Sequence, residues 1–285
     1  MHKHLLFFLA FSCSFAMPSI AQKSCVMRFL NEQKWNELFP NRYGVSTYKD
    51  PKRAAAPAID FYSFQAFCKA AKQFPNFLNE GKEADRKREL AAFLANAAQE
   101  TSGGWDEAPG GYFKWGFYFL EEQDWSKTHN NYADTSKKNW LPANGVSYHG
   151  RGPKQLSWNY NYGQFSEAYF GDKDSLLRHP ELLATDPVVS FASAIWFWMT
   201  AQPPKPSCHD IMIQKWIPTT RDSAANRYPG FGTTVNVING GVECGLANPK
   251  KKTQNRYAYY LYFCKYFKVD PGKNADCNGQ KPFNF

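Results

Sequence analysis

The apolar residues of this chain recur mostly at helical spacing. Between Ala84 and Thr101 the pattern predicts a helix with a buried face, because its leucines and alanines repeat with a period near that of an α-helix. Residues Pro187 to Thr200 are apolar on nearly every side, so a helix there is expected at the centre of the fold. Shorter helices are predicted at 22–38, 63–73 and 253–266. The pattern indicates a mainly α protein.

Two long segments lack this periodicity. Residues 39–57 contain several prolines and a run of alanines, which is typical of a linker. The compact part of the chain is therefore expected to start near Asp60. Residues 105–160 are rich in glycine, aromatic and polar residues, and we expect loops there with at most a small hairpin.

The first 21 residues have the pattern of a secretory signal peptide. A basic start containing Lys3 precedes an apolar stretch, and small residues lead to Ala21. A membrane anchor is the alternative, but Ser12, Ser14 and Pro18 interrupt the apolar run before about 20 residues. We expect cleavage near Ala21, export to the periplasm or the medium, and no contact with the membrane after cleavage.

Composition narrows the candidate partners. The net charge of +9 would suit nucleic acid or an anionic wall, but apart from residues 250–252 and a short face at 86–88 the basic residues are spread out, which favours an ordinary solvated surface and no nucleic acid. The 9 Trp and 16 Tyr indicate carbohydrate instead, because sugar faces stack on such rings. The histidines are scattered and no C-x-x-C pair occurs, so we expect neither a metal nor a cofactor.

Two glutamates lie among aromatic and small residues. Glu100 ends the predicted helix just before Gly103-Gly104, and Glu122 follows an aromatic stretch. Carboxyl groups in unlike surroundings can divide the roles of acid and base, and glycoside cleavage requires such a pair. From these residues alone, two surface charges are the far more common interpretation.

A third segment gives these glutamates a context. Residues 148–163, with the sequence YHGRGPKQLSWNYNYG, closely resemble the signature of the glycoside hydrolase family 19 chitinases. Residues 100–105, 183–207, 229–232 and 239–245 resemble the same family in the same order. The resemblance covers roughly 58–285 and implies a monomeric, two-lobed, lysozyme-like α+β fold that is mainly α, with a long substrate cleft and little sheet. Residues 1–21 and 22–57 are then the signal peptide and an N-terminal extension.

The resemblance also assigns roles within the cleft. Glu100 matches the general acid, Glu122 the general base, and Ser157 the serine that orients the attacking water. Arg256 and Glu243 match members of a charge network around the acid. The residues that match the sugar cleft are Trp105, Trp115, Gln155, Tyr160, Asn161, Lys205 and Asn239. The implied reaction inverts the anomeric centre, with carboxyl groups about 6.5–9.5 Å apart.

Some of these assignments have alternatives. Glu121 is expected to be a surface charge, although a shift of one residue would exchange it with Glu122. Trp105 and Trp115 could belong to the core, and Glu243 could be only a structural ion-pair member. Asn239 could serve only the turn before Gly240.

The chain also departs from the family pattern. Gln99 stands where many members have His, and Tyr118 stands where plant members have Cys. Six cysteines remain after the signal peptide, and they allow 15 pairings. The resemblance implies a Cys244–Cys277 disulfide. It leaves Cys25, Cys68, Cys208 and Cys264 open, with Cys68–Cys264 as one possibility.

The predicted function is therefore that of a secreted endo-chitinase acting on chitin or its oligosaccharides. A peptidoglycan-cleaving hydrolase is the first alternative, because the positive charge suits an anionic wall. A non-catalytic chitin-binding protein is the second, although such a protein is expected to have lost a catalytic carboxylate, and both glutamates are present here.

Overall fold

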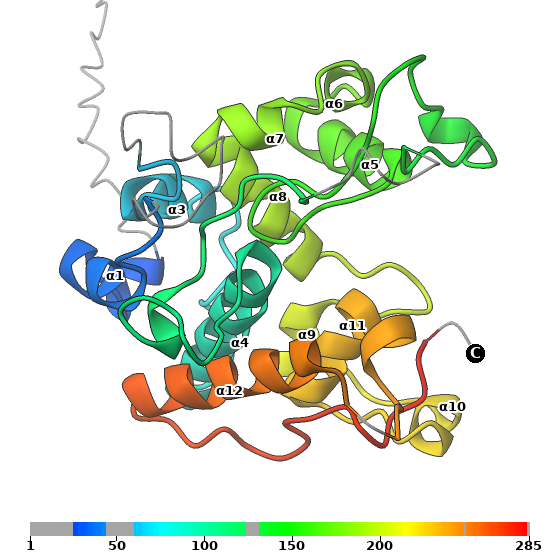
Figure 1. Cartoon of the computed structure of the whole chain (residues 1–285). Helices are drawn as coiled ribbons and strands as arrows, with labels where there is room; N and C mark the ends of the chain where they lie inside the picture. The colour runs from blue at the N-terminus through cyan, green and yellow to red at the C-terminus, as the bar shows by residue number, and fades with distance from the viewer. Residues whose placement is uncertain (1–24, 44–59, 124–130, 248, 284–285) are drawn as a thin grey trace, which may run out of the picture.

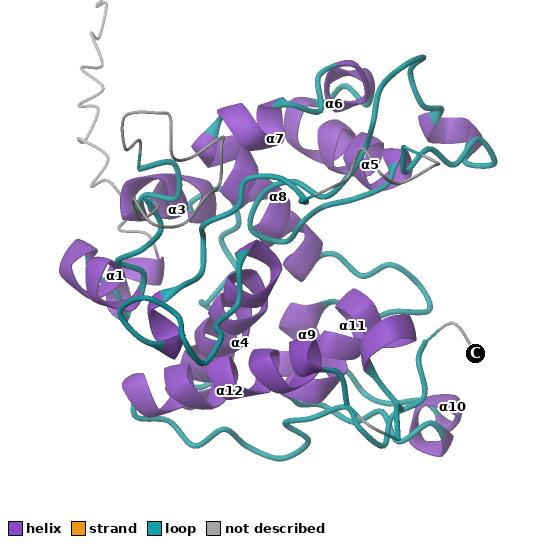
Figure 2. Cartoon of the chain, viewed as in Figure 1, coloured by secondary structure: helices purple, strands orange, loops and turns teal. Residues whose placement is uncertain are grey.

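The computed structural model describes residues 25–43, 60–123, 131–247 and 249–283. Helices joined by long loops make up this part of the chain (Figure 2). Strand pairing within it is limited to isolated bridges of Glu121 with Arg151, Arg151 with Leu156, and Gln202 with Lys205. The mainly α fold with little sheet is thus confirmed.

The helices, with 3-10 helices labelled η, are η1 Cys25–Arg28, α1 Glu32–Leu38, α3 Phe64–Ala71, α4 Glu83–Thr101, η2 Tyr112–Lys114, η4 Lys138–Trp140, α5 Asn159–Phe170, α6 Asp174–Arg178, α7 Leu182–Thr185, α8 Pro187–Met199, α9 Cys208–Met212, α10 Thr220–Ala224, α11 Phe231–Glu243 and α12 Lys251–Tyr266.

Helix α4 lies between two lobes. In Figure 1, α5 to α8 form one lobe and α9 to α12 form the other. Leu90 and Phe93 on α4 have no exposed surface, and neither do the alanines beside them. Small side chains let neighbouring helices approach closely, and α4 packs against both α12 and α9. The predicted helix at 84–101 is confirmed, and its last turn reaches the junction of the lobes.

Helix α8 begins with strong local signals. The Asp186 carboxylate accepts hydrogen bonds from the backbone N–H groups of Val188 at 2.8 Å and Val189 at 3.0 Å. Pro187 occupies the first turn, where its fixed φ suits a helix and its missing N–H costs nothing. The helix packs against α3, and most of its side chains are buried. The central helix predicted at 187–200 is therefore confirmed.

The N-terminal segment differs from its prediction. Instead of one helix at 22–38, η1 ends at Arg28 and α1 begins after Asn31, whose side chain accepts a hydrogen bond from the Lys34 N–H at 2.9 Å. Trp35 is fully buried, and its indole N–H donates to the Tyr62 carbonyl at 2.9 Å. Ring centroids within 4.8–6.2 Å of the Trp35 ring belong to Phe39, Phe64, Phe67, Phe117 and Phe191.

Residues 25–43 are thus part of the core, and the compact structure does not start near Asp60. The prediction was wrong because the whole stretch before Asp60 was treated like the linker at 39–57. Residues 25–43 instead contribute a large buried aromatic residue, Trp35. The predicted signal peptide and residues 44–59 of the linker lie outside the described residues. Where the described helices are concerned, none combines the length and the apolar character needed to cross a membrane.

One disulfide closes the C-terminal region. Cys244, directly after α11, is bonded to Cys277, with a Cα–Cα distance of 5.1 Å. Cys264 on α12 is a buried free thiol, so the possible Cys68–Cys264 pairing is wrong. Cys208 is also a buried free thiol, and the side chain of Cys25 lies outside the described atoms.

We predict that Trp35→Ala lowers the free energy of unfolding by about 3–5 kcal/mol, because it removes a fully buried aromatic ring and leaves a cavity. Met27→Ala, at a side chain that is 48% exposed in the same segment, is the matched control and should change stability by less than about 0.5 kcal/mol. Urea unfolding followed by circular dichroism measures both. Equal effects of the two substitutions would contradict the placement of this segment in the core.

Candidate active site

A cleft of about 670 Å³ lies between the lobes. Helix α4, the loops at 119–123 and 150–158, α5, the segment after α8, and α11 all contribute to its wall. The predicted site residues that line it are Glu100, Glu122, Gln155, Ser157, Tyr160, Asn161, Lys205 and Asn239. Residues that are far apart in the sequence therefore meet at one surface, with Glu100 and Glu122 on different elements.

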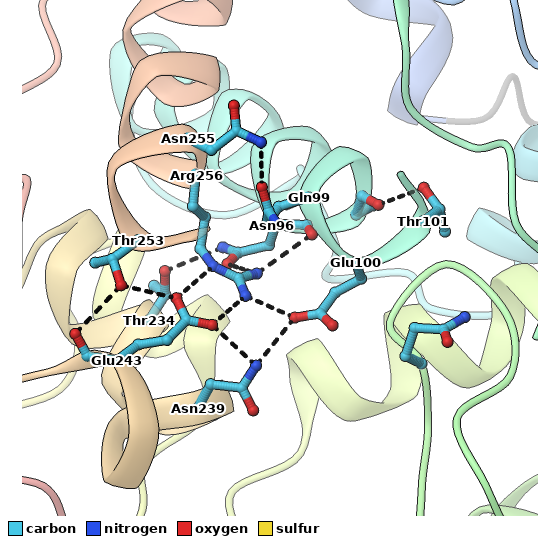
Figure 3. Close-up of polar contacts among 12 residues, drawn as sticks. Asn96, Gln99, Glu100, Thr101, Thr234, Asn239, Glu243, Thr253, Asn255 and Arg256 are labelled. Carbon is cyan, nitrogen blue, oxygen red and sulfur yellow. Dashed lines mark hydrogen bonds and ion pairs between the residues drawn. The ribbon is translucent and has the colours of Figure 1, made fainter. Parts of the chain in front are cut away.

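On one side of the cleft, a buried arginine holds Glu100. Arg256, on α12, is 1% exposed, and its Nη2 lies 2.8 Å from Glu100 Oε1 and 2.7 Å from Glu243 Oε1 (Figure 3). Its Nη1 donates to Asn96 Oδ1 at 3.0 Å. Burial alone would lower the pKa of Arg256, but the two carboxylates outweigh burial and raise it. The guanidinium therefore stays charged and fixes Glu100 at the end of α4.

Glu243 and Asn239 complete this network. The Asn239 side-chain amide donates to Glu243 Oε1 at 3.1 Å and to Glu100 Oε1 at 3.4 Å. Non-helical backbone at Asn239 (φ −136°, ψ 28°) kinks α11. Asn239 therefore has two roles: its backbone changes the direction of the chain, and its side chain binds the two carboxylates. Burial would raise the pKa of Glu243, but the adjacent Arg256 guanidinium more than compensates and lowers it. Glu243 is thus a buried, ionised counter-charge.

Glu122 has different surroundings. Its Oε1 accepts a hydrogen bond from the Tyr132 hydroxyl at 2.7 Å, and its Oε2 accepts one from the Gly150 N–H at 3.2 Å. The Glu122 N–H in turn donates to the Gly150 carbonyl at 2.7 Å. Burial and the hydrogen bond to Glu122 raise the pKa of Tyr132 to about 12, so the phenol stays a neutral donor. Tyr132 was not among the predicted site residues, because in the sequence it is one of many aromatic residues in a loop segment.

The neighbouring Glu121 is not the surface charge that was expected. It lies in the cleft wall, where its Oε1 accepts hydrogen bonds from Arg151 Nε at 3.0 Å and His149 Nε2 at 3.2 Å. Burial lowers the pKa of His149, so Arg151 is the cation of this group. The charge of Glu121 is therefore already compensated, whereas Tyr132 and Gly150, which donate hydrogen bonds to Glu122, are neutral groups.

The turn at 150–158 carries the remaining polar groups. Gln155 (φ 48°) and Trp158 (φ 76°) adopt left-handed backbone conformations that are uncommon for residues with side chains. The Ser157 hydroxyl donates to the Gln155 carbonyl at 2.9 Å, which leaves the acceptor side of its oxygen for a water proton. Such strained backbone is typical of functional sites.

Aromatic and amide groups continue the wall along α5. The rings of Trp158 and Tyr160 lie nearly parallel, with centroids 6.2 Å apart, and both line the cleft. The Asn161 side chain donates to the Ser157 carbonyl at 2.8 Å, and Lys205 Nζ donates to the Val237 carbonyl at 2.9 Å. These groups offer a stacking surface and fixed polar contacts of the kind that sugars require.

Two predicted cleft residues are placed elsewhere. Trp115 is fully buried, packs with Ala108 and Tyr118, and donates its indole N–H to the Pro109 carbonyl at 2.9 Å. The prediction that it contacts sugar was wrong, because no ligand can reach a side chain without exposed surface. Trp105 packs beside it, with ring centroids 4.8 Å apart, and is likewise absent from the cleft wall. A match to a family motif identifies a tryptophan but does not show whether its ring packs in the core or binds sugar.

Gln99, which replaces the frequent His, lies in the cleft wall and accepts a hydrogen bond from the Asn255 side chain. It thereby links α4 to α12 one residue before Glu100. In the described part of the chain, no group of three or more His, Cys, Asp or Glu side chains is placed to hold a metal ion.

A helical, two-lobed fold whose cleft presents separate carboxyl groups among aromatic and amide side chains is typical of glycoside hydrolases. Residues 45–277 match the sequence model of the family described as chitinase class I. The chain therefore belongs to this family, the family 19 chitinases.

Named relatives agree with this membership. The chain is 50% identical over 223 residues to endochitinase A2 of Pisum sativum, covering 78% of this chain and 66% of the relative. It is 47% identical over 235 residues to an endochitinase of Carica papaya, covering 82% and 93%. Among solved structures, chitinase C of Streptomyces griseus aligns with a TM-score of 0.66 at 28% identity, covering 90% of this chain and 99% of that one.

We predict that Glu243→Gln lowers the free energy of unfolding by about 3 kcal/mol near neutral pH, because it leaves the buried Arg256 with one counter-charge fewer. The pKa of Glu243 is lowered in the folded protein, so its carboxylate stabilises the fold above its ordinary value of 4.5. That contribution is lost as the pH falls through the lowered value, and the difference between variant and wild type should shrink in acid.

Urea unfolding at several pH values measures this difference. Asp174→Asn is the matched control, because it breaks an exposed ion pair with Arg178 and should cost less than about 1 kcal/mol. A constant difference across the pH range would contradict the ionised state of Glu243.

Proposed function

We propose that this chain is an inverting endo-chitinase that hydrolyses β-1,4 links between N-acetylglucosamine units. The observation that carries the proposal is the asymmetry of the cleft. Glu100 is held by the charged Arg256 network, whereas Glu122 accepts hydrogen bonds from the neutral Tyr132 and Gly150. Two carboxyl groups in unlike surroundings suit the separate roles of acid and base. The relatives named as endochitinases support chitin as the substrate.

In the proposed reaction, Glu100 donates its proton to the glycosidic oxygen as the bond from that oxygen to the anomeric carbon breaks. A water attacks the opposite face of the anomeric carbon and gives its proton to Glu122, so inversion follows. The Ser157 hydroxyl and the backbone that holds Glu122 against Gly150 orient this water. Arg256 and Asn239 then stabilise the carboxylate that Glu100 becomes.

Sugar binding is assigned to the rest of the wall. Tyr160 and Trp158 provide stacking faces, and Gln155, Asn161 and Lys205 provide polar contacts along the cleft. We also infer that the protein acts outside the cytoplasm as a monomer, after removal of residues 1–21. The Cys244–Cys277 disulfide supports the location, because such bonds persist in oxidising compartments.

We predict that Glu100→Gln and Glu122→Gln each reduce kcat on a chitin hexamer roughly 10²- to 10⁴-fold, which is the usual contribution of a general acid or base. Glu121→Gln is the matched control, since it removes a carboxylate from the same wall that is already paired with Arg151. Its loss should be much smaller. Chromatography of the hexamer products measures all three rates.

Other outcomes identify the alternatives. A larger loss with Glu121→Gln than with Glu122→Gln would transfer the role of base to Glu121. If purified peptidoglycan is cleaved while the hexamer stays intact, the substrate is peptidoglycan and not chitin. Binding of the hexamer without cleavage would indicate a chitin-binding protein.

A further inference from the structure

Lys154 is a buried cation that the proposed reaction does not use. It lies in the cleft turn two residues after Gly152, lines the same cleft as Glu100, and is 5% exposed. Its Nζ is inaccessible and has no hydrogen-bond partner among the described residues. The apolar ring of Phe197 lies 5.9 Å from this nitrogen. A buried ammonium without such a partner is costly, so its position beside the acid requires a physical explanation.

The charged and titratable groups that face Lys154 come from four helices. They are Glu100 on α4, Glu243 on α11, Arg256 on α12 and the thiol of Cys208 on α9. Burial lowers the pKa of Lys154 to about 8, although Glu100 acts in the opposite direction. Burial raises the pKa of Cys208 to about 12, so this thiol is neutral. While Glu100 is ionised, its surroundings below about pH 8 therefore hold two cations, Lys154 and Arg256.

The count of charges depends on the proton of Glu100. While Glu100 is protonated, Lys154 and Arg256 face one carboxylate, Glu243, and the group carries one excess positive charge. When Glu100 gives its proton to the glycosidic oxygen, its new carboxylate makes the group neutral. Without Lys154, the same step would take the group from neutral to negative. Charge interactions of this kind are strong where water is excluded.

We propose that Lys154 is a positioning residue whose buried ammonium favours proton donation by Glu100 through compensation of the carboxylate that this step creates. The inference rests on the proposed function, because it assigns the role of acid to Glu100.

The test is Lys154→Met, which keeps the length and the apolar stem but removes the charge. On the chitin hexamer we expect kcat to fall about tenfold or more, within the range of acid catalysis, with little change in KM. The alkaline limb of the pH–rate profile should move to higher pH, because the Glu100 carboxylate is less stabilised. The loss should be smaller on a 4-nitrophenyl chito-oligoside, whose phenolate leaves with little help from an acid.

Stability and charge controls separate this role from a structural one. Lys154→Met should not lower Tm, because it removes an unpaired buried charge, and Lys154→Arg should keep the wild-type alkaline limb. Lys215→Met, at a side chain that is 63% exposed, is the matched surface control. A large fall in Tm, an unshifted limb, or equal losses on both substrates with Lys154→Met would overturn the proposal. An inactive wild type would instead refute the proposed function itself.

Discussion

The ion pairs of the buried Arg256 guanidinium with Glu100 and Glu243 are the interaction on which the rest of the structure depends. A charge taken out of water must be paired, and removal of one partner is strongly destabilising. Arg256 on α12 therefore fixes Glu100 and Asn96 on α4 and Glu243 on α11. The alanine-rich face of α4 lets α12 approach closely enough for these contacts. The same contacts of Arg256 therefore hold the helices together and fix the position of the proposed acid, Glu100.

The surroundings of Glu122 are built by other means. Glu122 lies in a loop, and its carboxylate is held by the Gly150 backbone and the Tyr132 hydroxyl. Asn159 supports the segment that follows Tyr132, because its side-chain amide donates to the carbonyls of Asp134 at 3.0 Å and Trp140 at 2.6 Å. The proposed acid is thus held by buried charge and the proposed base by neutral hydrogen bonds. The proposed division into acid and base follows from this difference.

How much the sequence predicts depends on whether a signal is local. Helices α4 and α8 were predicted because the helical spacing of the first and the apolar run of the second lie within the segments themselves. Trp35 was missed as a core residue because its partners come from distant segments. Trp115 was assigned to sugar because a signature does not record which way a ring faces. Tyr132 and Lys154 gain their meaning only from the carboxylates that folding places beside them.

The anomeric form of the first products is the most direct test of the central claim, which is that Glu100 and Glu122 act on opposite faces of the sugar with a water between them. Proton NMR of a chitin hexamer during the first minutes of cleavage distinguishes the anomers before they equilibrate. We expect the newly formed reducing ends to be α. Products that begin as β would show retention, and the assignment of Glu122 as the base for an attacking water would be wrong.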